Sequence, residues 1–545
     1  MIDARVKVPH PVNEPVLSYA PGSPERAALK AELARQSGEV LEIPMVIGGE
    51  RVTTGEQRDA VMPHRHAHVI GRYHWGETSH MDQAIAAAQD AREAWMAMPL
   101  RARSAIFLKA ADLLAGPWRQ RINASTMLGQ SKTAFQAEID AACELADFFR
   151  FNAAYAEQIH GDQPGSVRGL WDQVDYRPLD GFVLAVTPFN FTSIAANLCA
   201  APALMGNTVV WKPSLLAMHS AYQLMLLFEA AGVPPGVINL VTGDPASLVD
   251  RALESPDFAG LHFTGSTAVL KALFGKIGER LDRYRAYPRI VGESGGKDFI
   301  VVHPSAKDDL DAVATAIVRG GFELQGQKCS AASRCYVPRS MWPALKARLI
   351  EMVASLKMGD VADFRNFMGA VIGRAAFDRN AAYQEHARSS SGIEVVCGGN
   401  ADDSVGYFVE PTIALVEDPQ DKLMAEEIFG PIVGVHLYDD DAYEETLALC
   451  DATSPYALTG AVFSRDRGAI EIALRMLRHA AGNFYINDKP TGAVVGQQPF
   501  GGSRASGTND KAGSAQNLLR WVSPRTIKET FVPPVAPGYP FMDAE

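Results

Sequence analysis

Short apolar runs alternate with helix-length segments through the middle of the chain. Strand-like runs lie at Phe182–Val186, Thr208–Trp211, Val237–Val241 and Leu261–Phe263, with helix-like stretches at 193–204, 217–231 and 245–254 between them. Strands that are buried on both faces are continuously apolar rather than alternating, and these runs have that character. The pattern predicts an α/β fold built on a doubly wound parallel sheet.

One uncharged stretch, Gly181 to Trp211, is long enough to span a bilayer. It is interrupted by prolines and asparagines, including Pro188 and Asn207, which mark turns. We therefore interpret it as strand, loop, buried helix and strand, and we expect no membrane association.

A second α/β block begins after Glu293, with a strand at Phe299–Val302, and extends to about residue 500. The polar, turn-rich segment 161–180 has the character of a protruding hairpin. The stretch from Phe531 to Phe541 contains four prolines and three aromatic residues, which predicts an extended arm.

Composition narrows the class of function. The chain has 545 residues, is 47% hydrophobic and carries a net charge of -12, so it can bury a large core but is a poor nucleic-acid binder. A small-molecule substrate fits better. The six cysteines include no CxxC pair, and the segment Met1–Arg5 lacks the character of a signal or transit peptide, so we expect a cytoplasmic protein.

Cys329 stands out from the other five cysteines, which are interpreted as buried core residues. Its neighbours Lys328 and Ser330 are polar, and a nearby basic residue or helix start would favour the reactive thiolate. Glu293 follows a strand-like run and precedes two glycines, a place where active-site carboxylates are often found. Asn190 could cap a helix beginning near Ser193 or donate to a developing oxyanion.

Five motifs in order resemble the aldehyde dehydrogenase superfamily. They cover most of the chain and are Thr187–Phe191, Phe263–Thr267, Gly292–Lys297, Gly326–Ala331 and Glu426–Pro431. The resemblance implies that Cys329 attacks an aldehyde, that the Asn190 side chain and the Cys329 N–H hold the oxyanion, and that Glu293 activates the water that releases the acid.

The same resemblance implies NAD as the cofactor and no metal ion. It assigns the adenosine ribose to Lys212 and the nicotinamide end to Glu427 and Phe429, with Thr187 beside the cofactor. Leu215 stands where many NAD-preferring relatives have an acidic residue, but no nearby Arg or Lys could receive a 2′-phosphate. The pyrophosphate is expected at the helix start formed by Gly265, Ser266, Thr267, Ala268 and Val269.

Four further segments, 148–152, 487–493, 496–502 and 505–511, resemble the branch that oxidises L-glutamate γ-semialdehyde, formed from 1-pyrroline-5-carboxylate, to L-glutamate in the second step of proline degradation. Another carboxylated semialdehyde is the alternative substrate. Glu144 is a weaker candidate for the substrate ammonium and could equally be a solvated helix charge. The expected substrate contacts are Ser330, the backbone of Gly492 and Ala493, and the rings of Phe189 and Phe500.

The resemblance also implies the domain organisation. We expect an NAD-binding domain from 1–160 and 181–293, a catalytic domain from 294–500, and a bridging or oligomerisation element with a C-terminal arm from 161–180 and 501–545. An unpaired hairpin edge predicts at least a homodimer. A proline dehydrogenase that supplies the substrate is a candidate partner.

Two other classes of protein remain open from the residues alone. A cysteine hydrolase or acyltransferase could use Cys329, but it would ordinarily need a histidine, and none of the 13 histidines lies in these motifs. A non-catalytic derivative of the superfamily is also conceivable, although all three catalytic residue types are present.

Overall fold

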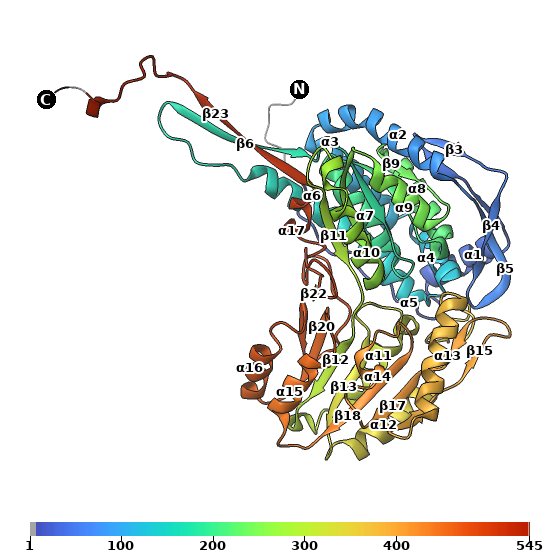
Figure 1. The fold of residues 1–545 in the computed structure, drawn as a ribbon. Coiled ribbons are helices and arrows are strands. Elements are labelled where there is room, and N and C mark those ends of the chain that lie inside the picture. Colours follow the sequence, from blue (N-terminus) through green and yellow to red (C-terminus); the bar gives the residue numbers. More distant parts are fainter. Residues whose placement is uncertain (1–6, 543, 545) are drawn as a thin grey trace.

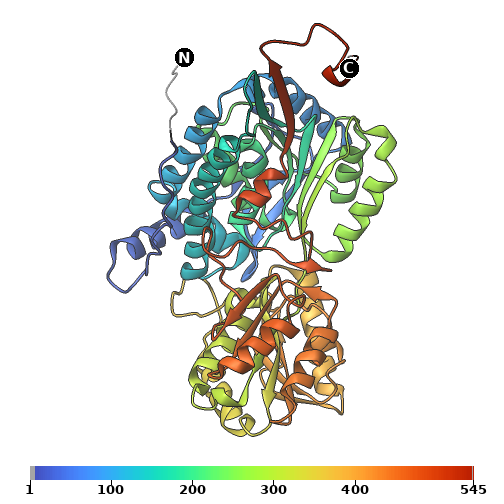
Figure 2. The ribbon, with the colours of Figure 1, turned by 90° about the vertical axis from the view of Figure 1, so that its left-hand side faces the viewer.

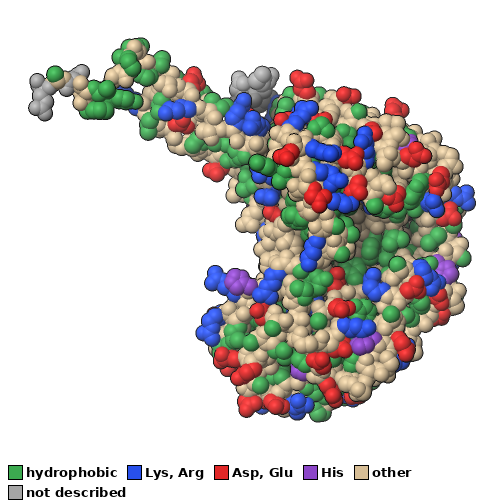
Figure 3. Space-filling view, viewed as in Figure 1, with side chains coloured by type: hydrophobic (Ala, Val, Ile, Leu, Met, Phe, Trp, Pro, Cys, Tyr) green, Lys and Arg blue, Asp and Glu red, His purple; other side chains and the backbone are tan. Residues whose placement is uncertain are grey.

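Two seven-stranded sheets form the cores of two α/β lobes, and a long two-stranded ribbon projects from the upper lobe (Figure 1). The computed structural model describes residues 7–542 and 544; the segment Met1–Arg5 lies outside this range. The lobes remain distinct when the molecule is turned by 90° (Figure 2). The surface is hollowed where they meet (Figure 3).

The sheet of the first lobe has the order β11-β10-β7-β8-β9-β2-β3. Its first five strands are parallel, whereas β2 and β3 are antiparallel additions at one edge. All four predicted strands are confirmed as members of this sheet. The strands are β2 Met45–Ile47, β3 Glu50–Val52, β7 Phe182–Val186, β8 Thr208–Lys212, β9 Ile238–Leu240, β10 Phe258–Thr264 and β11 Arg289–Glu293.

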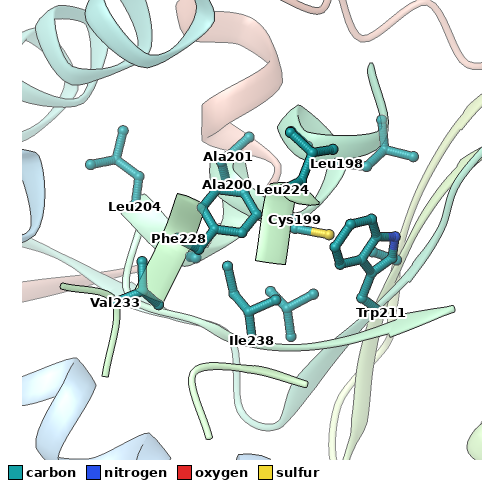
Figure 4. Packing of buried hydrophobic residues seen from close by; sticks show 14 of the residues in the cluster. Leu198, Cys199, Ala200, Ala201, Leu204, Trp211, Leu224, Phe228, Val233 and Ile238 are labelled. Atoms are coloured by element: carbon teal, nitrogen blue, oxygen red, sulfur yellow. The ribbon is translucent and has the colours of Figure 1, made fainter. Parts of the chain in front are cut away.

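Side chains of the central strands alternate between two separate hydrophobic clusters, one on each face of this sheet. Val183 and Trp211 belong to one cluster, whereas Leu184 and Val210 belong to the other. Figure 4 shows Trp211 beside Cys199 of α7, with Phe228 of α8 on the other side of Cys199 in the same cluster. Continuous apolar strands are therefore explained by helices on both faces.

Three helices of this lobe, α7, α8 and α9, match the three helix-like stretches of the sequence to within one residue at each end. The helices of the lobe are α1 Pro24–Ser37, α2 Thr78–Ala97, α3 Leu100–Ala115, α4 Arg119–Gln130, α5 Ala134–Ala137, α6 Leu145–Gly161, α7 Thr192–Leu204, α8 Met218–Ala231, α9 Pro245–Glu254, α10 Thr267–Gly278 and α17 Ala515–Leu519. A π-helix, Glu138–Glu144, joins α5 to α6. A three-stranded sheet at the edge contains β1 Leu41–Ile43, β4 Gln57–Met62 and β5 Arg65–His74.

The second lobe has a sheet of order β14-β17-β18-β13-β12-β20-β21, parallel except for β14. Its strands are β12 Asp298–Val302, β13 Ala332–Pro338, β14 Ile393–Cys397, β17 Thr412–Val416, β18 Ile432–Tyr438, β20 Thr459–Phe463 and β21 Asn483–Ile486. Its helices are α11 Leu310–Phe322, α12 Trp342–Ser355, α13 Arg374–Ser389, α14 Lys422–Ala425, α15 Tyr443–Ala452 and α16 Arg467–Met476. Two small pairs, β15 Ala401–Asp402 with β16 Phe408–Val409 and β19 Tyr456–Ala457 with β22 Ser503–Arg504, lie outside this sheet.

The segment 161–180 is not a hairpin closed on itself, and that expectation is wrong. Its strand β6, Leu170–Pro178, pairs antiparallel with β23, Val522–Thr530, from the far end of the chain. Two-stranded pairing satisfies one edge of each strand and leaves the other edge open. In its described residues, the arm that follows β23 has no strand or α-helix and contains one short 3₁₀ turn, Pro540–Met542.

Among the helices that the structure describes, none is long and apolar enough to cross a membrane. The uncharged stretch from Gly181 to Trp211 forms β7, α7 and most of β8, as interpreted from its turn residues.

Candidate active site

A cavity of about 330 Å³ contains Cys329 in its wall. Its lining comes from both lobes: the π-helix and α6 contribute one side, and the segment 491–500 contributes another. Ser330, Gly492, Ala493 and Phe500 all line this cavity, as the sequence predicts. Residues more than 160 positions apart along the chain thus meet beside one thiol.

The segment before Cys329 is held in an unusual backbone conformation. Leu324 and Gln325 have φ values of 55° and 54°, in the left-handed region that non-glycine residues rarely adopt. The Gln325 side chain donates to the carbonyl oxygens of Ser131 and Ala370, at 2.9 and 2.6 Å. Such a conformation persists only where the surroundings hold it in place, and it sets the position of the nucleophile loop.

The electrostatic surroundings of Cys329 differ from the expectation. The Lys328 ammonium does not face the thiol; it forms a buried ion pair with Glu323 at 2.9 Å. Burial raises the pKa of the Cys329 thiol well above its usual value, and the carboxylates of Asp298, Glu293 and Glu427 raise it further. Both effects favour the neutral thiol, and Lys328, the adjacent basic residue, pairs with Glu323 instead of stabilising a thiolate.

Glu293 is the last residue of β11, where the parallel strands of the first sheet end. Its carboxylate accepts a hydrogen bond from the Gly502 N–H at 3.4 Å. Burial raises the pKa of this carboxyl well above its usual value, and the positive charge of Lys511 opposes the rise only in part. A carboxyl group with such a pKa can accept a proton at moderate pH, as a general base must.

Asn190 is buried and does not cap α7. Its side-chain amide donates to the carbonyl oxygen of Gln327 at 3.1 Å, two residues before the nucleophile. The N-terminus of α7 is instead capped by Asp140 of the π-helix, which accepts from the N–H groups of Thr192 and Ser193, both at 2.9 Å. The Asn190 amide is thus held against the nucleophile loop, which suits an oxyanion donor.

Glu144 is a half-buried member of the π-helix and lines the cavity, so the solvated-charge interpretation is wrong. Its carboxylate accepts from the Ser193 hydroxyl at 3.1 Å. Burial raises the pKa of Glu144 to about 8, and the neighbouring Asp140 charge adds to the rise. A cationic partner within the cavity would favour the ionised form of this buried carboxyl group.

One predicted aromatic residue is misplaced. Phe189 does not line the cavity; its ring packs edge-on against Phe429, with centroids 5.8 Å apart. Phe191, two residues later, lines the cavity together with Phe500. The signal was present in the same Thr187–Phe191 motif, but the turn geometry decides which of the two rings enters the site.

The Ser330 hydroxyl lies 2.8 Å from the hydroxyl of Thr491, which the sequence did not single out. Gly492 has φ of 99°, a left-handed value that favours glycine. A Cβ atom placed on Gly492 would lie 3.3 Å from the Lys489 ammonium nitrogen, so this part of the loop carries positive charge. Hydroxyl and backbone donors beside an ammonium group form an environment suited to a carboxylate.

Lys212 is the last residue of β8 and is largely buried. Burial lowers its pKa to about 8, while the distant charge of Asp244 favours the protonated form. Within the described part of the chain, the ammonium group has no hydrogen-bond or ion-pair partner. Thr187 lies beside the backbone of Lys212. The Thr187 N–H donates to the Lys212 carbonyl at 3.3 Å, and the Thr187 hydroxyl accepts from the Trp211 indole N–H.

The five residues Gly265, Ser266, Thr267, Ala268 and Val269 lie together where β10 ends and α10 begins. Ser266 is the N-cap and accepts from the Val269 N–H. The exposed N–H groups of such a turn suit a phosphate group. Thr267 faces the other way: its hydroxyl contacts Ser294 at 3.1 Å and accepts from the Gly295 N–H at 3.3 Å.

Glu427 and Phe429 belong to the second lobe and contact the segment after Glu293 and the Phe189 ring, respectively. The Glu427 carboxylate accepts from the Gly296 N–H at 3.0 Å, and burial raises its pKa to about 6. Phe429 adopts a φ of 57°. The loop of the second lobe that carries Glu427 and Phe429 therefore contacts both the Glu293–Lys297 segment and the Phe189 ring.

Comparisons with known proteins show the family of this chain. The model of the aldehyde dehydrogenase family matches residues 52–527, and the chain belongs to this family. The crystal structure of the Delta-pyrroline-5-carboxylate dehydrogenase from Mycobacterium tuberculosis bound with NAD has a TM-score of 0.96 and 54% identity, and each chain covers 100% of the other. The mitochondrial Delta-1-pyrroline-5-carboxylate dehydrogenase of Homo sapiens is 51% identical over 96% of this chain and 92% of its own. That of Dictyostelium discoideum is 50% identical over 99% and 97%.

Proposed function

We propose that this chain oxidises L-glutamate γ-semialdehyde, the open form of 1-pyrroline-5-carboxylate, to L-glutamate with NAD. The observation that carries this proposal is the cavity at Cys329, whose wall combines the nucleophile with Ser330, Gly492 and Ala493. Relatives of about 50% identity over nearly the whole chain that bear the corresponding name support the same reaction.

In the first step the Cys329 sulfur attacks the aldehyde carbon and forms a hemithioacetal. As the carbon–sulfur bond forms, the thiol proton passes to water; burial and the nearby carboxylates raise the pKa of Cys329 and so favour the neutral thiol before attack. The developing oxyanion is held by the Asn190 side-chain amide and the Cys329 N–H. Donors fixed in place before the reaction stabilise such charge without a reorganisation cost.

In the second step a thioester on Cys329 is hydrolysed. Glu293 takes a proton from the attacking water, because burial raises the pKa of its carboxyl and makes its carboxylate a stronger base. The products are the free thiol and L-glutamate. The absence of any histidine from the described lining of the cavity argues against a cysteine hydrolase.

The cofactor groove runs past Lys212 and the start of α10. A largely buried ammonium without a protein partner and a helix N-terminus together fit the ribose and pyrophosphate of a dinucleotide. NAD, when bound, accepts the hydride that the hemithioacetal releases. Glu427 and Phe429 would hold the nicotinamide end. The N-terminal sheet is accordingly proposed as the NAD-binding domain and the second as the catalytic domain.

Substrate selection rests on the two charged ends of an amino acid aldehyde. The carboxylate would bind Ser330 and the N–H groups of Gly492 and Ala493, near the Lys489 ammonium. Glu144 would receive the substrate ammonium. In place of the predicted Phe189, we assign Phe191 with Phe500 to the aliphatic chain.

One assay tests this proposal: NADH formation followed by absorbance with glutamate semialdehyde as substrate and hexanal as the uncharged comparison. The expected result is turnover of glutamate semialdehyde with a kcat/KM at least about tenfold above that for hexanal, since unpaired polar groups penalise the neutral substrate. Equal values would exclude a carboxylate-selective site. Thioester or ester hydrolysis without NADH would indicate a hydrolase.

The β6–β23 ribbon supports a proposal of self-association. Among the described residues, the outer edge of β23 has no strand partner and that of β6 is met only by the side chains of Gln163 and Ser166. The following arm exposes Phe531, Val532 and Val535. Open strand edges and apolar side chains of this kind are normally covered by a partner. We propose at least a homodimer. A proline dehydrogenase partner and a cytoplasmic location stay predictions.

A further inference from the structure

The N-terminal segment 7–22 runs without regular secondary structure until α1 begins at Pro24. We name this segment the N-terminal strap. Three of its residues, Asn13, Glu14 and Val16, line the same cavity as Cys329. None of them belongs to a motif that pointed to the reaction, and the model of the family begins only at residue 52.

The strap is attached to α6 through Asp147. The Asn13 side-chain amide donates to one oxygen of this carboxylate at 2.8 Å, and the Glu14 N–H donates to the other at 2.7 Å. Asp147 is only 3% exposed. Burial raises its pKa to about 6, and the hydrogen bonds from Asn13 and Glu14 oppose that rise. The carboxylate therefore relies on the strap for its hydrogen bonds.

Asn13 also reaches the loop that supplies Gly492 and Ala493. Its amide nitrogen donates to the Val495 carbonyl at 2.8 Å, and its oxygen accepts from the Gln497 side chain at 3.0 Å. The Asn13 side chain thus connects α6 to the segment 495–497, which is more than 480 positions from Asn13 in sequence. Few side chains of this size can bridge two walls of a cavity with all of their polar atoms in use.

The rest of the strap is held by charge. The Glu14 carboxylate pairs with Arg119 at 2.6 Å and with Arg150 at 2.7 Å. Further along, the Leu17 N–H and the Tyr19 hydroxyl both donate to the buried carboxylate of Glu138, at 2.8 Å each. These contacts give the strap one defined path across the π-helix and α6.

We propose that the N-terminal strap is a wall of the substrate site and that Asn13 is a positioning residue, which holds the Gly492–Ala493 loop in register with α6. This inference rests on the proposed function for the identity of the substrate. The strap restricts the space beside Phe500 and keeps the carboxylate donors in place. Loosening it enlarges the cavity and leaves the chemistry at Cys329 intact.

A charge-exchange pair of variants tests the bridge. Asn13→Asp places a second carboxylate against Asp147 and removes both amide donors, whereas the double variant Asn13→Asp with Asp147→Asn restores one amide–carboxylate hydrogen bond in reversed direction. His10→Ala is the control, because His10 is an exposed strap residue outside the cavity lining.

For glutamate semialdehyde, Asn13→Asp should raise KM about tenfold and change kcat less than about twofold, the scale of losing hydrogen bonds to a charged group. The double variant restores the bond to α6 but not the donor to the Val495 carbonyl, so it should return KM only part of the way, to within about threefold of the parent, and His10→Ala should leave KM unchanged. NAD affinity and thermal stability, measured on each variant, report general damage. A double variant no better than Asn13→Asp, or an Asn13→Asp KM equal to that of His10→Ala, overturns the proposal.

A second readout does not depend on the substrate. With NAD present to occupy the cofactor groove, iodoacetamide should alkylate Cys329 several-fold faster in Asn13→Asp than in the parent, and the double variant should reverse this. Peptide mapping separates Cys329 from Cys143, which also lines the cavity. Unchanged alkylation rates would refute the wall. Failure of the parent enzyme to oxidise glutamate semialdehyde would instead refute the proposed function. The alkylation rates would still test whether the N-terminal strap forms a wall of the cavity.

Discussion

The ammonium group of Lys132 lies 2.5 Å from the carboxylate of Asp140, and both side chains are excluded from solvent. The same carboxylate caps the first turn of α7 through the N–H groups of Thr192 and Ser193. The Lys132 ammonium also lies 4.4 Å from the centre of the Phe191 ring. This ion pair therefore orients the segment that carries both Asn190 and the cavity-lining ring.

Asp140→Asn should destabilise the protein by about 3 to 5 kcal/mol, because it leaves the Lys132 ammonium buried without an opposite charge. Activity should fall as well, since the start of α7 loses its carboxylate cap. Denaturant unfolding and kcat/KM measure the two effects. Asp82→Asn is the matched control: it breaks the exposed Arg251 pair and should cost no more than about 1 kcal/mol. Equal losses in the two variants would contradict a structural role for the buried pair.

Cys329→Ala should abolish aldehyde oxidation and leave NAD affinity within about twofold of the parent, because the thiol forms the covalent intermediate but does not hold the dinucleotide. Steady-state NADH formation and a fluorescence titration with NADH check both expectations. Cys397→Ser, at a half-buried cysteine of the second lobe, should retain activity. Substantial turnover by Cys329→Ala would remove this residue from the mechanism.

Glu293→Gln should produce a burst of NADH close to one equivalent, followed by steady turnover reduced about a hundredfold or more, because hydride transfer precedes the hydrolysis that needs the base. Stopped-flow absorbance resolves the two phases. If the burst and the steady rate fall together, Glu293 acts in an earlier step.

The raised pKa of Glu293 also predicts a pH dependence. Steady-state turnover of the parent should fall as pH drops below that pKa, since protonation removes the base. Between the ordinary and the raised pKa the folded state binds more protons than the unfolded state, so the stability from this group decreases as pH rises. Glu293→Gln should therefore exceed the parent in stability at high pH, with the difference shrinking towards acid pH. The sign of this stability difference is tested by measuring the denaturant midpoint of both proteins between about pH 5 and pH 9, in steps of about one pH unit.

Ser330→Ala should lower kcat/KM for glutamate semialdehyde about tenfold and leave the value for hexanal nearly unchanged, because only the carboxylated substrate uses the hydroxyl. Gly492→Val should affect the same substrate more strongly, since valine disfavours the φ of 99° at this position. Phe191→Ala should impair both substrates, and Phe189→Ala should impair them less. Equal losses for both aldehydes in Ser330→Ala would misplace the carboxylate site.

Removal of residues 531–545, which follow β23, should weaken self-association and leave the active-site geometry intact. Light scattering at micromolar concentration should give at least the dimer mass for the full chain and a lower average mass for the shortened one. The exposed apolar side chains of the arm supply the reason. A monomer in the full chain would overturn the proposed assembly.

The amino-acid sequence by itself predicted four strands of the first sheet, β7 to β10, and the helices α7 to α9 between them, because continuous apolar runs of strand length indicate burial on two faces. It also contained the motifs of the family, and with them the residues that we propose as nucleophile, base and amide donor. The apolar runs and the motifs are local signals, because each can be recognised within about ten consecutive residues.

Only the tertiary structure decided the partner of β6, the charge around Cys329, the choice of Phe191 over Phe189, and the place of the strap at the cavity. Each depends on residues that are distant in sequence. Lys328 is adjacent to Cys329, yet its ammonium group forms an ion pair with Glu323. Three carboxylates from other segments act on the thiol instead and raise its pKa. Periodicity and motif spacing describe neighbours along the chain, whereas pKa values and cavity walls are set by the sum of charges and contacts in space.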